Sequence, residues 1–167
     1  MTETKLAQNK RYSTFYLVML IISTLVASWT TMGLLSEAFH LGEYLRISPG
    51  YMTATILDLV GIIVADIALV YLWMRKTSEG TILITVGYGL TILGLIGEII
   101  FAQPILQHVI SHGTYDGTLT PSEQAASHTL LQFFAYTQYV VGVITLVVLV
   151  ILWRVAAKKE NTVSTKK

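Results

Sequence analysis

Histidine is the residue type in this chain best suited to bind a cofactor, and three of the four histidines fall within residues 103–128. His108 and His112 are four residues apart, so on a helix both imidazoles lie on one face. Such a pair can bind a transition metal, or one member can be an axial ligand of a haem. Alternatively, the imidazoles cap carbonyl groups at helix ends. We predict a site for a b-type haem or a transition metal at His108, His112, His128 and His40.

Acidic residues inside apolar segments form a second group of candidates. Asp58, Asp66 and Glu98 each interrupt a long apolar run. A charged side chain at the centre of a membrane span costs about 2.5–3.5 kcal/mol on insertion scales, so such residues face the bundle interior and are functional candidates. Asp58 and Glu98 lie at similar depths by residue count, and Glu37 precedes His40 by three residues. These acids could share a proton, hydrogen-bond a ligand histidine or coordinate a cation; alternatively, they bond Thr or Tyr on neighbouring helices as packing contacts.

A polar stripe follows one face of the last apolar segment. His128, Gln132, Tyr136 and Tyr139 are spaced by four, four and three residues, and Gly142 continues the series. Residues at this spacing share one face of a helix. We expect the stripe to face the interior and to meet Asp58 and Glu98. Proton relays and quinone pockets use such polar paths, and the same stripe can also serve only to lock helices together.

Four long apolar segments position these residues. They run over about 12–36, 51–74, 80–103 and 128–153, in a chain that is 53% hydrophobic and 13% charged. Each reaches the roughly 20 residues that a helix needs to cross the hydrocarbon core. We therefore predict an all-α integral membrane protein with a four-transmembrane-helix bundle over 12–157. Pro104 should separate a short outer helix at 104–112, and the segments 1–11 and 158–167 should be a cytoplasmic N-terminal segment and a disordered cytoplasmic tail.

The basic residues predict the orientation. Ten of the eleven lysines and arginines lie before the first span, between the second and third, or after the fourth, and only Arg46 lies on the other side. Because Lys and Arg accumulate on the cytoplasmic side, we expect both termini there and the histidines on the outer side of a multi-pass plasma-membrane protein. Trp73 and Trp153, beside basic residues, are expected in the aromatic belt of the inner interface.

Several classes of function are excluded or unsupported. The chain has no cysteine, which excludes disulfides and cysteine-held metal centres. No phosphate-binding glycine motif, G-x-S-x-G or H-E-x-x-H sequence occurs. A nucleic-acid partner has no support, because the basic residues flank the membrane spans.

One sequence resembles a known family. PSEQAASHTLL, which opens the last span, looks like the histidine-bearing helix start of the haem A synthase type of membrane protein. The resemblance covers only a small part of the chain, and it implies a haem held by outer-face histidines. That family also carries a ligand histidine near the start of its second helix, where this chain reads SPGYMTATILD without one. Glu37-x-x-His40 has a suitable composition but lies at the end of the first span.

Together these features favour a small membrane subunit of an energy-transducing, respiratory or redox complex, with a histidine and carboxylate site at its outer face. Four spans with short connections leave little room for a self-contained enzyme. Two alternatives stay open: a structural subunit without a cofactor, and a small oligomeric transporter that uses Asp58 and Glu98 for proton or ion coupling. The expected partners are membrane lipid, and either other membrane subunits or further copies of the chain.

Overall fold

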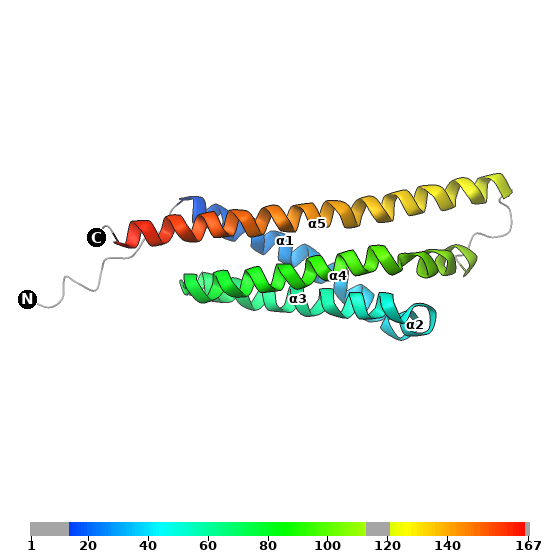
Figure 1. Ribbon diagram of the computed structural model, residues 1–167, viewed down its shortest axis with the longest axis horizontal. Helices are drawn as coiled ribbons and strands as arrows, with labels where there is room; N and C mark the ends of the chain where they lie inside the picture. The colour runs from blue at the N-terminus through cyan, green and yellow to red at the C-terminus, as the bar shows by residue number, and fades with distance from the viewer. Residues whose placement is uncertain (1–13, 113–120, 166–167) are drawn as a thin grey trace, which may run out of the picture.

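The computed structural model describes the backbone of residues 14–112 and 121–165, and the side chains of residues 14–108, 129, 130 and 132–158. The described part is all helical (Figure 1), with the helices α1 (Thr14–Ala38), α2 (Leu41–Ile47), α3 (Pro49–Trp73), α4 (Thr77–His112) and α5 (Pro121–Thr165). The four long helices, α1, α3, α4 and α5, are long and apolar enough to cross a membrane. The predicted all-α class with four long apolar helices is therefore confirmed, whereas insertion in a membrane and the orientation of the termini stay predictions.

The two ends of the bundle differ in composition. The turn between α3 and α4 and the C-terminal part of α5 lie at one end, and α2 lies at the other (Figure 1). We call these the basic end and the α2 end, because Arg75, Lys76, Arg154 and Lys158 lie at the first. The predicted N-terminal segment 1–11 lies outside the described residues.

Three helix boundaries differ from the sequence predictions. The short helix α2 was not expected between the first two spans. Segment 104–112 is not a separate helix, because α4 continues through Pro104 to His112. Segment 158–165, expected to be disordered, continues α5 to Thr165. The residues AAKKE at 156–160 are strong helix formers, and extending an existing helix costs less than starting a new one.

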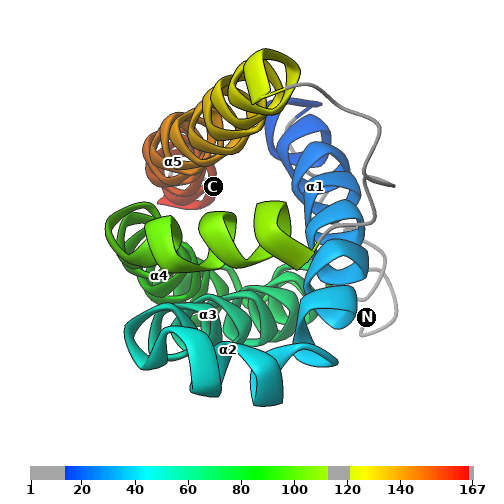
Figure 2. The ribbon, with the colours of Figure 1, turned by 90° about the vertical axis from the view of Figure 1, so that its right-hand side faces the viewer.

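Ser48 contacts α4 close to the proline inside that helix. Pro104 cannot donate the usual backbone hydrogen bond, which weakens the preceding turn. The hydroxyl of Ser48 donates to the carbonyl oxygen of Phe101 in that turn, at 3.3 Å. The carbonyl that loses its helical partner is that of Ile100, four residues before Pro104, so the Ser48 contact is an additional bond to the neighbouring carbonyl. The helix bends without breaking, and Figure 2 shows the last turns of α4 directed across the α2 end toward α1.

Glycines bring α3 and α4 into close contact. A Cβ atom added at Gly61 would lie 2.5 Å from the backbone nitrogen of Thr91, and one at Gly94 would lie 2.6 Å from the backbone nitrogen of Asp58. Small residues allow this approach in membranes, where packing and not the hydrophobic effect holds helices together. The glycine contacts therefore fix the position of Asp58 on α3 relative to α4.

The main core lies toward the basic end and centres on Trp153. Its side chain is fully buried, its Nε1 donates to Ser23 Oγ at 2.8 Å, and its ring meets that of Tyr16 edge-on. The prediction that Trp153 lies in an interface belt is therefore wrong. The indole has a buried hydroxyl partner on α1, which is the usual requirement for burying a tryptophan. Trp73, by contrast, is half exposed and donates to Thr24 Oγ1.

Candidate functional site

A cavity of about 470 Å³ lies between α1, α3, α4 and α5. We call it the acid cavity because three carboxylic acids line it. Its polar lining comes from all four helices and includes Glu37, Asp58, Thr91, Glu98, Gln138 and Tyr139. All three acids were candidates from their positions in the sequence, and in the structure all three line this cavity.

Asp58 and Glu98 lack the partners that buried carboxyl groups ordinarily have. Asp58 is 4% exposed and Glu98 is 1% exposed. Asp58 Oδ1, Glu98 Oε1 and Thr91 Oγ1 have no hydrogen-bond partner among the described residues. The hydroxyl of Thr55 lies near Glu98 and donates to the carbonyl of Tyr51 at 3.1 Å. Native proteins satisfy most such groups, so these oxygens are candidates to bind a proton or a ligand.

The three acids influence one another electrostatically. Glu98 lies within electrostatic range of both Glu37 and Asp58. The Thr91 hydroxyl lies near Asp58 but outside hydrogen-bond geometry. Because like charges in a site of low dielectric repel strongly, the cavity favours any positive charge or proton that reduces this repulsion.

Tyrosines close the cavity toward the α2 end. The hydroxyls of Tyr51 on α3 and Tyr139 on α5 lie 2.8 Å apart, and the ring of Tyr44 meets that of Tyr51 edge-on at 5.0 Å. Burial, followed by the charges of Glu37, Glu98 and Glu43, raises the pKa of Tyr44 to about 12. Tyr44 therefore keeps its proton at physiological pH and can act as a hydrogen-bond donor.

Two of the four histidines meet at a residue that sequence analysis missed. Glu43 on α2 lies 3.1 Å from His108 Nε2 through Oε1 and 3.6 Å from His40 Nδ1 through Oε2. The spacing of His40 and Glu43, three residues apart, was the available signal. His108 comes to Glu43 only because α4 continues past Pro104. This contact is at the surface, since Glu43 is about half exposed.

The structure leaves the proposed haem or metal site untested. No three His, Asp or Glu side chains within the described ranges are grouped so that they could hold a metal ion. The backbones of His112 and His128 belong to α4 and α5, but their side chains lie outside the described residues. The cofactor therefore stays a prediction that depends on His112 and His128.

Residues of the polar stripe on the last span contact two different parts of the bundle. Tyr139 and Gly142 line the acid cavity with Asp58 and Glu98, as predicted for this face. Tyr136 packs instead against the small apolar cluster of Tyr51, Ala102 and Ile105 near the α2 end. Gln132 is partly buried.

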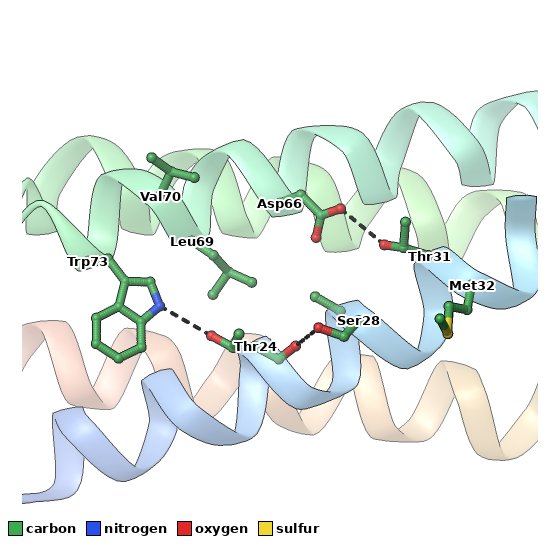
Figure 3. A pocket seen from close by; sticks show the side chains of 9 residues that line it. Thr24, Ser28, Thr31, Met32, Asp66, Leu69, Val70 and Trp73 are labelled. Carbon is green, nitrogen blue, oxygen red and sulfur yellow. Dashed lines mark hydrogen bonds between the residues drawn. The ribbon is translucent and has the colours of Figure 1, made fainter.

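Asp66 lies in a different place from the other acids. It lines a groove of about 350 Å³ between α1 and α3, toward the basic end (Figure 3). Thr31 Oγ1 donates to Asp66 Oδ2 at 3.0 Å, and Trp73 donates to Thr24 in the same groove. We call this region the Asp66 groove. Its polar groups bond one another across two helices, as expected of a packing contact.

Comparison of the chain with protein-family models, with curated proteins and with solved structures found no match. The likeness to the haem A synthase type at PSEQAASHTLL stays a prediction. The chemistry of the acid cavity is therefore inferred from its own side chains.

Proposed function

We propose that the protein is a membrane carrier in which Asp58 and Glu98 exchange a proton for a cation. The observation that carries this proposal is the pair of buried carboxyl groups, each with an unpartnered oxygen, in one cavity between four helices. Substrate and coupling-ion sites of transporters lie near the bilayer midplane between helices, and intramembrane acids commonly relay the protons.

In this proposal Glu98 has a different role from Asp58 and Glu37. Glu98, the more deeply buried, holds the proton or the positive charge of the ligand. Asp58, fixed against Gly94, and Glu37, at the end of α1, add negative charge to the same space. A proton and a cation then compete for one site, because each relieves the same repulsion among carboxylates. Competition of this kind is the minimum requirement for exchange.

The experiment is labelling of the full-length protein in membranes with dicyclohexylcarbodiimide, which reacts with carboxyl groups that carry a proton and are shielded from water. We expect the label on Glu98 or Asp58, with a rate that falls as pH rises. Glu98→Gln combined with Asp58→Asn should remove the label, and Asp66→Asn is the matched control that should retain it. Equal labelling of Asp66, or no label on Asp58 and Glu98, would show that these acids exchange no protons.

A redox subunit is the second candidate, and the meeting of His40 and His108 at Glu43 favours it. In that function the histidines would hold a haem or metal at the α2 end together with His112 or His128. The test is the visible absorption spectrum of the purified protein, oxidised and then reduced. A Soret band that shifts on reduction and is lost in His128→Ala would support this candidate, and a colourless, metal-free, folded protein would eliminate it.

A further inference from the structure

The residues that line the acid cavity also indicate which class of cation would bind there. This inference rests on the proposed function and concerns the chemical class of the ligand. Three properties of the cavity bear on it: its charge, the nature of its walls and the position of its opening.

The charge of the lining is negative. Three carboxylic acids line the cavity, and its described lining contains no Lys, Arg or His. Asp58 and Glu98 are both more than nine-tenths buried, and one oxygen of each, Asp58 Oδ1 and Glu98 Oε1, has no hydrogen-bond partner among the described residues. Since an unpaired buried charge costs several kcal/mol, an anionic ligand is disfavoured and a cationic one is favoured.

The walls do not suit a small inorganic cation. Hard cations such as Ca²⁺ need six to eight oxygen ligands, and Mg²⁺ needs octahedral geometry. No three described His, Asp or Glu side chains are grouped closely enough to hold a metal ion. Much of the lining is apolar, including Leu34, Ile62, Leu95 and Leu146. An organic cation with a diffuse charge needs no complete oxygen shell, and its apolar body would contact these residues. A cavity of about 470 Å³ is also within the range of small-molecule sites.

The opening faces the side of the bundle. The lining residues Trp29 on α1 and Val141 on α5 are 83% and 54% exposed. Both lie well inside the apolar spans Thr14–Ala38 and Gln132–Lys158, so, if these helices cross a membrane, this side of the cavity borders the hydrocarbon region. Figure 2 shows α5 and α1 on opposite sides of the upper part of the bundle, with α3 and α4 in its lower part. A ligand that enters here must first dissolve in the bilayer, and the indole of Trp29 offers an aromatic face to a cation at the entrance.

We propose that the ligand is an amphiphilic organic monocation, such as a hydrophobic ammonium or phosphonium, that enters the acid cavity from the bilayer between α1 and α5. Its positive charge lies between Glu98 and Asp58, and its apolar body contacts the leucine and isoleucine side chains of the walls.

The test compares two probes of nearly the same size and shape but opposite charge. Binding of tetraphenylphosphonium and of tetraphenylborate to the full-length protein in detergent is measured by calorimetry. We expect tetraphenylphosphonium to bind and tetraphenylborate not to bind. Glu98→Gln should weaken phosphonium binding by about tenfold or more, because a desolvated charge partner is lost. Asp66→Asn, which changes an acid outside the cavity, should leave binding unchanged. Bound phosphonium should also slow carbodiimide labelling of the wild-type protein.

The outcomes separate this inference from the proposed function. Equal binding of both probes, or phosphonium binding that is unchanged in Glu98→Gln, would mean simple partitioning into apolar surface and would overturn the inference. Carbodiimide labelling of Glu98 or Asp58 without phosphonium binding would overturn the ligand class alone and leave the proton site standing. Loss of both signals in folded wild-type protein would overturn both proposals.

Discussion

Two aspartates on α3, eight residues apart, have opposite surroundings. Asp66 accepts a hydrogen bond from Thr31 at 3.0 Å in the Asp66 groove (Figure 3). Asp58 faces α4 and the acid cavity, where its Oδ1 has no partner among the described residues. Eight residues correspond to a rotation of about 80° around a helix, which is enough to turn one residue toward α1 and the other toward α4.

Asp66 has the hydrogen bond expected of a packing contact, whereas the surroundings of Asp58 suit the proposed function. A buried carboxyl that bonds a neighbouring helix contributes to stability, whereas one left unpartnered costs free energy. In the proposed function, a proton or a cationic ligand would be the partner of the acid that has none within the described residues. Ligand binding in the acid cavity should therefore depend on the charge of its acids. Hydrogen bonds in the Asp66 groove should instead contribute to the stability of the fold.

The largest effect on stability is expected from a substitution at Gly94, the glycine that packs against Asp58. Gly94→Ala places a Cβ atom 2.6 Å from the backbone nitrogen of Asp58, so α3 and α4 must separate. We expect this overpacking to lower the free energy of unfolding by about 1–3 kcal/mol. The measurement is unfolding by SDS in mixed micelles, followed by circular dichroism.

Gly89→Ala is the matched control on the same helix, because a Cβ atom there has nothing within 4 Å. It should raise the free energy of unfolding by about 0.5–1 kcal/mol, the usual gain from replacing a helical glycine by alanine. Similar results for the two variants would mean that α3 and α4 are not held by close glycine contacts and that Asp58 is not fixed by them.

Replacing Glu98 or Asp66 should change the free energy of unfolding by a smaller amount. The sign of the change should be opposite for the two acids. Glu98→Leu replaces an unpartnered buried carboxyl with an apolar side chain of similar size, so it should raise the free energy of unfolding by roughly 1–2 kcal/mol while abolishing carbodiimide labelling at that position. Asp66→Leu removes the acceptor of Thr31, so it should lower the free energy of unfolding by roughly 1 kcal/mol.

Thermal unfolding of both variants in one detergent provides the comparison. Destabilisation by Glu98→Leu as large as that by Asp66→Leu would indicate that Glu98 has a protein partner and that the acid cavity is an ordinary packing contact.

The acid cavity was largely predictable from sequence because rare residues mark it. Acids in apolar spans are costly, so Asp58 and Glu98 had to face the interior, and the three- and four-residue steps of the last span placed Tyr139 and Gly142 on the same face. The sequence distinguished Asp58 from Asp66 only by depth, because Asp58 matches Glu98 by residue count. Their difference depends on which helix each one meets, and that is set by tertiary packing.

The errors also have physical reasons. Trp153 is adjacent to basic residues, as belt tryptophans are, but Ser23, which is 130 residues away, gives its indole a buried partner. Pro104 does not end α4, which continues to His112, and His108 lies 3.1 Å from Glu43 on α2. Glu43 was missed because α2 was not expected. In each case a contact distant in sequence overrides a local pattern.

The smallest predicted effect concerns two threonine–aspartate pairs and tests the comparison most directly. Thr31 bonds Asp66, whereas Thr91 lies near Asp58 without a hydrogen bond. Double-mutant cycles with Thr→Val and Asp→Asn measure the interaction within each pair. We expect a coupling energy of about 0.6 kcal/mol for Thr31 and Asp66, the average for hydrogen bonds between membrane helices, and a value near zero for Thr91 and Asp58. If the second pair had the larger coupling, Asp58 would have the same structural role as Asp66, and Glu98 alone would remain as the candidate for proton exchange.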